Sequence, residues 1–295
     1  MHIPDGFLDA KTVLVTAGLS AVGLGTALRQ ARLHMPRRSV PMMGLAAAFV
    51  FVAQMLNFPV AAGTSGHLVG AALVAVLLGP AAAVIVISAV LIVQCLLFAD
   101  GGLSALGANI FNMALVGSVA GYAIYAVMHK VFPSPRGRLA AVAFSSWCAT
   151  VLAAVCCAGE LAWSGTVPWA AVLPAMTGVH MLIGLGEAVI TAMVIAALDR
   201  IGFAELPTGL AARPGGFLVY GLLLALGLAL FVAPFASPWP DGLEKVAFML
   251  GFAHKAASHS TAVAWAGGLS TAAAFVCSWG LAGWLVPAQR AEGKR

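Results

Sequence analysis

Long apolar stretches separated by short polar segments are the feature that most constrains how this chain folds. A membrane-spanning helix needs about 20 mainly apolar residues, and most of these stretches are long enough. With 62% hydrophobic and 8% charged residues, the chain has too much apolar surface for a soluble core. The sequence predicts an all-α integral membrane protein with seven helices, followed by two C-terminal transmembrane helices. The stretches are approximately 12–30, 40–56, 67–79, 81–99, 107–129, 138–160, 170–198, 216–235 and 261–286.

The third stretch, 67–79, is too short to cross a bilayer upright. A polar, glycine-rich run at 57–66 precedes it. Irregular backbone at membrane depth is tolerated only where protein or a cavity surrounds it. We therefore expect a loop that dips inward to meet a short helix beginning at His67.

Basic residues are unevenly divided between the loops that nine crossings would place on opposite sides. Three of them fall on one side, namely Lys11, Lys245 and Lys255. The other side receives Arg29, Arg32, Arg37, Arg38, Lys130, Arg136, Arg138, Arg200, Arg213, Arg290, Lys294 and Arg295. Because positive charge accumulates in cytoplasmic loops, we expect a multi-pass protein of the cell membrane with its N-terminus outside and its C-terminus in the cytoplasm. The loop bias accounts for the formal charge of +5, so lipid rather than nucleic acid is the expected partner.

The same alternation predicts that several polar segments share the outer face with the N-terminus: 57–66, 99–105 and 159–168. The predicted outer face also carries most of the acidic residues: Asp5, Asp9, Asp100, Glu160, Asp241 and Glu244. The opening residues, MHIPDGFL, lack the basic region of a cleavable signal peptide. We therefore expect an uncleaved N-terminus, with Met1 retained because the bulky His2 follows it.

A retained Met1 followed by His2 can chelate a metal ion. The α-amino nitrogen, the backbone nitrogen of His2 and His2 Nδ1 close a five-membered and a six-membered ring around one ion. Three in-plane nitrogens suit the square-planar preference of Cu(II) and Ni(II). His67 is the candidate for the fourth ligand, since its segment shares the predicted outer face. The alternative for His67 is a loop histidine satisfied by a neighbouring carbonyl group.

Two further groups of polar residues lie within apolar stretches. His180 and Glu187 are seven residues apart and so share one helical face. They are interpreted as an interhelical hydrogen-bonded pair, as support for the metal ligands, or as a contact surface for a partner subunit. Asn109 and Asn112 share another face, and either could orient the N-terminal segment or His67. We expect His34, His129, His254 and His259 to be ordinary loop histidines.

Other motifs limit the chemistry. All five cysteines, namely Cys95, Cys148, Cys156, Cys157 and Cys277, lie in apolar stretches without metal-site spacing, so packing is their expected role. No phosphate-binding loop matches GxxxxGK[ST], so no ATP site is expected in this chain. A polar segment at 199–215 marks a domain boundary, and the PDGLE sequence follows at 240–244.

Four motifs, in order, resemble the CbiM/NikM family: MHIPDGFL at 1–8, NFPVAAGTSGHL at 57–68, DGGLSALGANIFNMA at 100–114 and GVHMLIGLGEAVIT at 178–191. These proteins are the substrate-capture components of energy-coupling-factor transporters for cobalt and nickel. The PDGLE segment resembles the CbiN/NikN accessory subunit. The resemblance implies a metal-capture domain over 1–200 and a two-helix CbiN/NikN-like domain over 201–295.

The resemblance also implies a site and partners. Met1, His2 and His67 would bind Ni²⁺ or Co²⁺ as the transported substrate. A transmembrane coupling subunit and cytoplasmic ATPases would be the partners. The expected function is therefore the substrate-binding subunit of an ATP-driven transition-metal importer and not an enzyme, with nickel preferred because a planar four-nitrogen site suits it.

Two alternatives belong to other classes. The sequence GTSG at 63–66 matches the serine motif of rhomboid-type intramembrane proteases, with Ser65 as nucleophile and His180 as base. The other alternative is a secondary transporter that needs no partner subunit.

Overall fold

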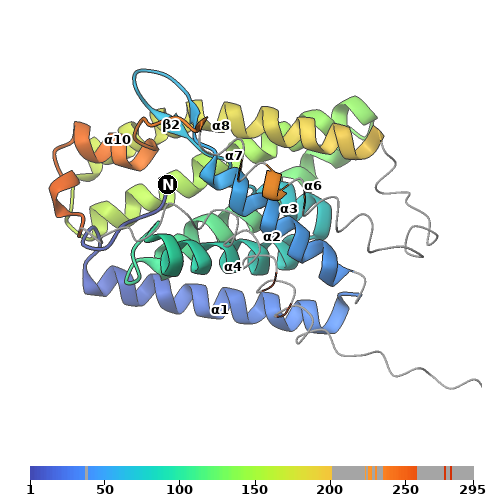
Figure 1. The fold of residues 1–295 in the computed structure, drawn as a ribbon, viewed down its shortest axis with the longest axis horizontal. Helices are drawn as coiled ribbons and strands as arrows, with labels where there is room; N and C mark the ends of the chain where they lie inside the picture. The colour runs from blue at the N-terminus through green and yellow to red at the C-terminus, as the bar shows by residue number, and fades with distance from the viewer. Residues whose placement is uncertain are drawn as a thin grey trace, which may run out of the picture.

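The computed structural model describes residues 1–36, 39–200, 223, 225–227, 230, 235–257, 276 and 280. Most of the predicted helix at 216–235, all but two residues of the one at 261–286, and Cys277 and His259 lie outside the described residues. The described elements are almost all helical (Figure 1). They are α1 (Ala10–His34), α2 (Val40–Met55), β1 (Phe58–Pro59), β2 (Ser65–Gly66), α3 (Ala71–Leu78), α4 (Pro80–Phe98), α5 (Leu106–Asn109), η2 (Ile110–Ala120), α6 (Gly121–Val131), α7 (Pro135–Trp163), α8 (Trp169–Arg200), α10 (Gly242–Met249) and η6 (Ala253–Lys255).

Five helical segments of the described chain are long and apolar enough to cross a membrane: α1, α4, the continuous run through α5, η2 and α6, α7, and α8. Helix α2 has 16 residues and α3 only eight. The middle of the α5–α6 run is a π-helix of 11 residues, a geometry often found at functional sites. The membrane-protein class is thus supported by both length and composition.

Helix α1 shows which solvent these helices meet. Its buried residues are small or polar, such as Thr12, Thr16 and Ser20. Its exposed residues include Leu14 and Val22, whose exposed fractions are 72% and 68%. A helix of a soluble protein has the opposite pattern, with its apolar face toward the core. Small residues facing other helices and large apolar residues facing outward are typical of a helix in lipid.

Helix α4 is the most deeply buried of the candidate spans. Its side chains form the core together with residues of α2 and η2, among them Phe51, Ile87 and Met113. Helices α7 and α8 pack against each other more extensively than any other described pair. Ser134 caps α7 by accepting a hydrogen bond from the Gly137 backbone, and proline occupies the first helical turn, where its missing N–H costs nothing.

The polar run 57–66 forms the small antiparallel pair β1–β2, with Phe58 opposite Gly66. The short helix after it begins at Ala71 and not, as predicted, at His67. Gly70 has a left-handed backbone with φ of 75°, which helices do not continue through. His67 therefore lies in the loop between β2 and α3.

The segments predicted to share one face do gather at one end of the molecule. The N-terminus, the β1–β2 pair and α10 lie at this end in Figure 1. Hydrogen bonds attach the two other predicted loops to this end. In the loop at 99–105 the Gly102 N–H donates to the Ile3 carbonyl, and in the loop at 159–168 the Thr166 carbonyl accepts from the Lys255 ammonium. This group of loops is called the loop end below.

Candidate metal centre

The N-terminal segment is held inside the loop end by its backbone. The Ile3 N–H donates to Asn109 Oδ1 at 2.8 Å, and Asn109 Nδ2 returns a hydrogen bond to the Ile3 carbonyl at 3.1 Å. Gly102 allows this close approach, because a Cβ atom there would lie 2.3 Å from the Asp5 backbone nitrogen. Ile3 is fully buried and Met1 nearly so. The chain terminus is therefore fixed in position rather than left in solvent.

The loop that carries His67 is positioned by helix α8. Both Glu187 carboxylate oxygens accept backbone hydrogen bonds, from Val69 at 2.6 Å and from Gly70 at 2.9 Å. Gly66 packs directly on α8, where a Cβ atom would lie 2.7 Å from an Ile183 methyl carbon. As a result, His67 Nε2 lies 2.9 Å from the Met1 amine nitrogen.

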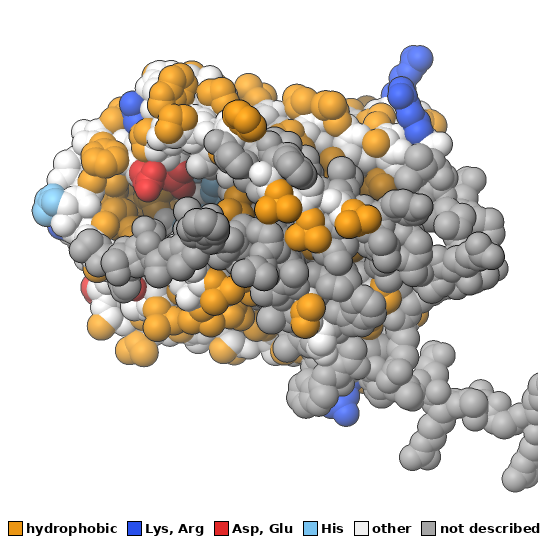
Figure 2. Space-filling view, viewed as in Figure 1, with side chains coloured by type: hydrophobic (Ala, Val, Ile, Leu, Met, Phe, Trp, Pro, Cys, Tyr) orange, Lys and Arg blue, Asp and Glu red, His pale blue; other side chains and the backbone are white. Residues whose placement is uncertain are grey.

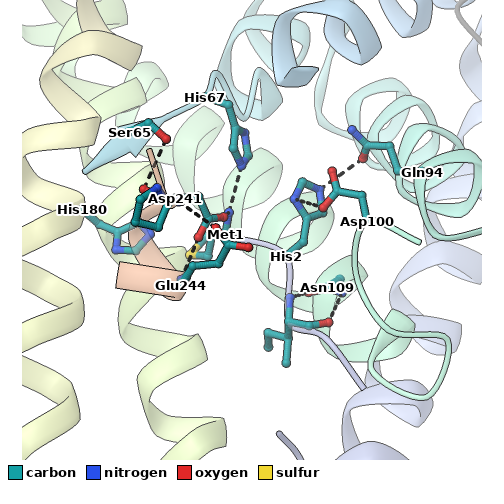
Figure 3. A network of polar contacts seen from close by, with 12 residues as sticks. Met1, His2, Ser65, His67, Gln94, Asp100, Asn109, His180, Asp241 and Glu244 are labelled. Carbon is teal, nitrogen blue, oxygen red and sulfur yellow. Dashed lines mark hydrogen bonds and ion pairs between the residues drawn. The ribbon is translucent and has the colours of Figure 1, made fainter. Parts of the chain in front are cut away.

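Asp241 supplies the counter-charge of the N-terminal amine. Its Oδ2 lies 2.8 Å from the Met1 nitrogen, while its Oδ1 accepts the Glu244 N–H at 2.8 Å. Asp241 and Glu244 form a capping box at the start of α10. The preceding residues join the β1–β2 pair through the Ser65 N–H, which donates to the Pro240 carbonyl. The PDGLE segment thereby places a carboxylate against the chain terminus (Figure 3).

His2 lies between these groups and the loop at 99–105. Its ring stacks on that of His67, with centroids 5.1 Å apart. His2 Nδ1 lies 3.2 Å from Asp100 Oδ1, and Nε2 lies 3.2 Å from Gln94 Oε1. One ligand atom each from His2, His67 and Asp241 lie within 4.8 Å of one another.

Burial and charge set the protonation of this cluster. Burial is the largest cause lowering the pKa of His67 well below its usual value, and the positive N-terminal amine lowers it further. Burial also lowers the pKa of His2, against an opposing effect of Asp100. For Asp241, burial favours the neutral acid, but the N-terminal ammonium outweighs it and holds the carboxyl pKa well below its usual value. The imidazoles are thus neutral, as metal ligands must be, beside a charged ammonium–carboxylate pair.

The structure therefore brings together all three residues singled out from the sequence as metal ligands: Met1, His2 and His67 (Figure 3). Their role as ligands stays a prediction. Sequence reasoning missed Asp241, Gln94 and Asp100 as neighbours of this group. The sequence signal for the two carboxylates was the loop alternation, which placed Asp100 and Asp241 on the same predicted face as the N-terminus.

Two pairs of buried polar residues were each expected to act together, but the members of each pair have different partners. Asn109 does orient the N-terminal segment, whereas Asn112 donates to Glu160 on α7 at 2.7 Å. His180 and Glu187 are not hydrogen-bonded to each other. His180 Nδ1 lies 2.8 Å from the Met176 carbonyl of its own helix, while Glu187 supports the loop of His67.

The arrangement expected of a serine protease is not formed. The Ser65 hydroxyl donates to the Trp239 carbonyl at 2.7 Å, and Ser65 is fully buried. His180 Nε2 has no hydrogen-bond partner among the described residues. A nucleophile must be within hydrogen-bond reach of its base, so this pair lacks the required contact.

The remaining predicted loop histidines differ in their surroundings. His34 and His254 are exposed, as expected. His129 is partly buried and stacks on Tyr125, with ring centroids 5.5 Å apart. Cys95, Cys148, Cys156 and Cys157 are free thiols.

Known proteins resemble this chain in both sequence and structure. Residues 2–204 match the family model described as "Cobalt uptake substrate-specific transmembrane region" (CbiM), and residues 215–284 match the PDGLE domain. A putative fused nickel transport protein NikMN of Archaeoglobus fulgidus is 37% identical over 257 residues, which are 85% of this chain and 83% of that protein. A probable fused nickel transport protein LarMN of Lactiplantibacillus plantarum is 32% identical, over 79% of this chain and 76% of that protein.

A crystal structure described as a transition metal transporter is 32% identical, with a TM-score of 0.63. The similarity covers 73% of this chain and all of that one. Together with the sequence matches, this similarity assigns the chain to the CbiM family of cobalt-uptake transmembrane proteins, with a CbiN-like PDGLE domain in the same polypeptide.

Proposed function

We propose that this chain is the substrate-binding membrane subunit of an ATP-driven importer and that it captures Ni²⁺, or Co²⁺, at the loop end. The observation that carries this proposal is the 2.9 Å approach of the N-terminal amine to His67 Nε2, with His2 stacked beside them. An amine and two neutral imidazoles are strong ligands for these ions. The relatives' nickel-transport names and the family description support the same class of substrate.

The proposed ligands are the Met1 amine nitrogen, the His2 backbone nitrogen, His2 Nδ1 and His67 Nε2. Among the described residues, the His2 N–H makes no hydrogen bond, whereas the adjacent Ile3 N–H is bonded to Asn109. The His2 nitrogen is therefore not already committed to another protein group. Ile3 supplies a fixed point from which Met1 and His2 can close around an ion.

Capture requires a local rearrangement. His2 Nδ1 now faces Asp100 and must turn toward the amine to complete the chelate. The amine must also lose the proton that Asp241 stabilises, because only its unprotonated form can bind metal. Both changes involve side chains and the terminal residue, so they leave the Asn109 anchor in place.

Nickel is the preferred substrate in this proposal, because a planar set of four nitrogens matches the tetragonal preference of Ni(II). The domains are a capture domain over 1–200 and a CbiN/NikN-like domain over 201–295, which contributes Asp241. The loop end faces outward and the C-terminus is cytoplasmic, following the distribution of basic residues. A transmembrane coupling subunit and cytoplasmic ATPases would supply energy and open the site inward.

The test is to move the amine by one residue. The full chain with its native N-terminus is compared, by calorimetry with Ni²⁺, with a form that carries one glycine ahead of Met1. We expect the extended form to lose measurable capture, because the new amine can no longer reach the position beside His67.

A glycine added after Arg295 is the control, and this form should bind Ni²⁺ as the native chain does. Equal affinity in the native and N-terminally extended forms would exclude the proposed ligand set. Uptake in liposomes separates the transport classes: the proposal requires the partner subunits and ATP, whereas uptake by this chain alone with a proton gradient would contradict it.

A further inference from the structure

A cavity of about 260 Å³ has His2 and His67 in part of its wall. We propose that this cavity is a docking site for the hydrated divalent cation, which waits there with its water shell before entering the nitrogen site. The inference rests on the proposed function and adds an earlier position for the ion, in the part of the cavity lined by oxygen-bearing side chains. Figure 2 shows acidic side chains gathered in a hollow of the surface, with a histidine behind them.

The volume fits a hydrated ion. Six water molecules occupy about 180 Å³ at their share of liquid volume, roughly 30 Å³ each. A bare ion with nitrogen ligands would need far less space. The cavity therefore has room for an ion that has not yet lost its water, next to the ligands that replace that water.

The lining is suited to coordinated water rather than to the bare metal. Gln54, Asn57 and Gln94 line the cavity, and each offers an amide group. Gln54 is nearly fully buried, its Nε2 donates to the Val69 carbonyl at 2.9 Å, and its Oε1 has no partner among the described residues. Gln94 Nε2 and Asn57 Oδ1 are also without partners there. Buried polar groups are normally hydrogen-bonded, so unsatisfied amides beside a cavity indicate a polar occupant.

The charge of the lining favours a cation. Asp100, Asp241 and Glu244 line the same cavity. The N-terminal ammonium neutralises Asp241, which leaves Asp100 and Glu244 to attract a positive ion. Lys245 is adjacent in sequence, but its ammonium donates to the Ala62 carbonyl and it does not line the cavity. A cleft lined by one sign of charge concentrates the opposite ion and raises its rate of association.

An exchange-inert ion tests this proposal. Hexaamminecobalt(III) resembles a hydrated cation but cannot release its ligands, so it can occupy the cavity and cannot enter the nitrogen site. The rate of Ni²⁺ loading into the full chain is followed by stopped-flow absorbance at constant ionic strength. We expect hexaamminecobalt(III) to slow loading in a saturable manner and to leave the final amount of bound Ni²⁺ unchanged.

Two variants and a control make the test specific. Glu244→Gln keeps the oxygen that caps the Asp241 N–H and removes the charge, and Gln54→Met removes the unsatisfied amide. We expect each to slow Ni²⁺ loading about threefold to tenfold and to raise the inhibitory concentration of hexaamminecobalt(III) by a similar factor. Asp9→Asn removes one charge from the loop end away from the cavity and preserves the cap of α1, so its rate should equal that of the native chain.

The outcomes separate the two proposals. Inhibition that is absent in the native chain, or equally strong in all three variants, would overturn the docking site while Ni²⁺ capture at equilibrium remained normal. Failure of the native chain to capture Ni²⁺ at equilibrium would instead overturn the proposed function, and the docking site with it.

Discussion

The two ends of the helical bundle each hold an ion pair, in very different surroundings. At the loop end, the Met1 ammonium and Asp241 have side-chain exposures of 3% and 15%. At the other end, Arg138 at the start of α7 pairs with Asp199 at the end of α8, with exposures of 28% and 38%. Solvent screens the second pair, and such pairs contribute about 0–1 kcal/mol. The first pair is protected from that screening.

The difference indicates which end carries the chemistry. Burying charge costs free energy, and removing one partner leaves the other charge buried and unpaired. A chain that only needed to close its loops could use apolar contacts instead. The amine, two imidazoles and a carboxylate at one point instead resemble a binding site, where buried polar groups are expected. The following predictions test this contrast, beginning with the largest effect.

Removing the His67 imidazole should lower Ni²⁺ affinity more than any other single substitution considered below. His67→Ala removes a proposed ligand, so Ni²⁺ affinity should fall by more than about 100-fold, the upper effect of losing even an outer-shell partner. Calorimetry measures the change. His254→Ala changes an exposed histidine of the same end and should leave the affinity unaltered. Binding that survived in both variants would remove His67 from the site.

Acid should weaken capture, because the amine must lose a proton to bind the metal. The pKa values of His2 and His67 are lowered by burial, so these imidazoles compete with protons only below their ordinary pKa of about 6.5. Metal binding requires unprotonated nitrogens, so Ni²⁺ affinity should fall as the pH drops through the range in which the two imidazoles gain protons. Calorimetry between about pH 5 and 8 measures the change, and an affinity that did not fall on acidification would argue against a site made of unprotonated nitrogens.

Loosening the support of His67 should have an intermediate effect. Glu187→Gln replaces two carboxylate acceptors, which hold the backbone of Val69 and Gly70, with one amide oxygen. We expect about a tenfold loss of Ni²⁺ affinity, as is usual for groups that orient ligands. Glu187→Asp keeps both oxygens on a shorter side chain and tests whether position or charge matters. Native affinity in Glu187→Gln would show that the loop holds its shape without α8.

Breaking either ion pair should have the smallest effect of these changes, and the buried pair should lose more unfolding free energy than the exposed one. Asp241→Asn keeps the helix cap and removes the charge that faces the ammonium. The free energy of unfolding should fall by about 1.5–3 kcal/mol, the usual contribution of a hydrogen bond to a charged group. Asp199→Asn should cost less than about 1 kcal/mol. Thermal unfolding of both variants under the same conditions gives the comparison. An equal or reversed order would contradict the contrast between the two ends.

Much of the helical framework could be predicted from hydropathy alone. The stretches predicted at 12–30, 81–99 and 170–198 correspond to α1, α4 and α8, with boundaries within a few residues. Such boundaries follow from local features, because apolar runs end where caps and polar loops begin. The start of α3 was placed four residues too early, since its true position depends on Glu187, more than 100 residues away in the sequence.

The site was predicted only in part, for a similar reason. Met1, His2 and His67 carry recognisable metal-binding chemistry, so residue type and motif were enough to select them. Asp241 was not selected, because a carboxylate at a helix start is most simply read as a cap. Its contact with an amine 240 residues earlier depends on how the PDGLE segment packs on the β1–β2 pair.

The sequence by itself determined that the helices lie in lipid, approximately where they begin and end, and which residues are the strongest ligand candidates. Hydrophobicity and side-chain chemistry are properties of individual segments, so they can be read without the fold. Only the tertiary structure decided that the amine meets His67 and Asp241, that His2 turns toward Asp100, and that an acidic cavity lies beside them. These relations depend on distances between loops on different helices, and such distances are fixed by packing rather than by any local pattern.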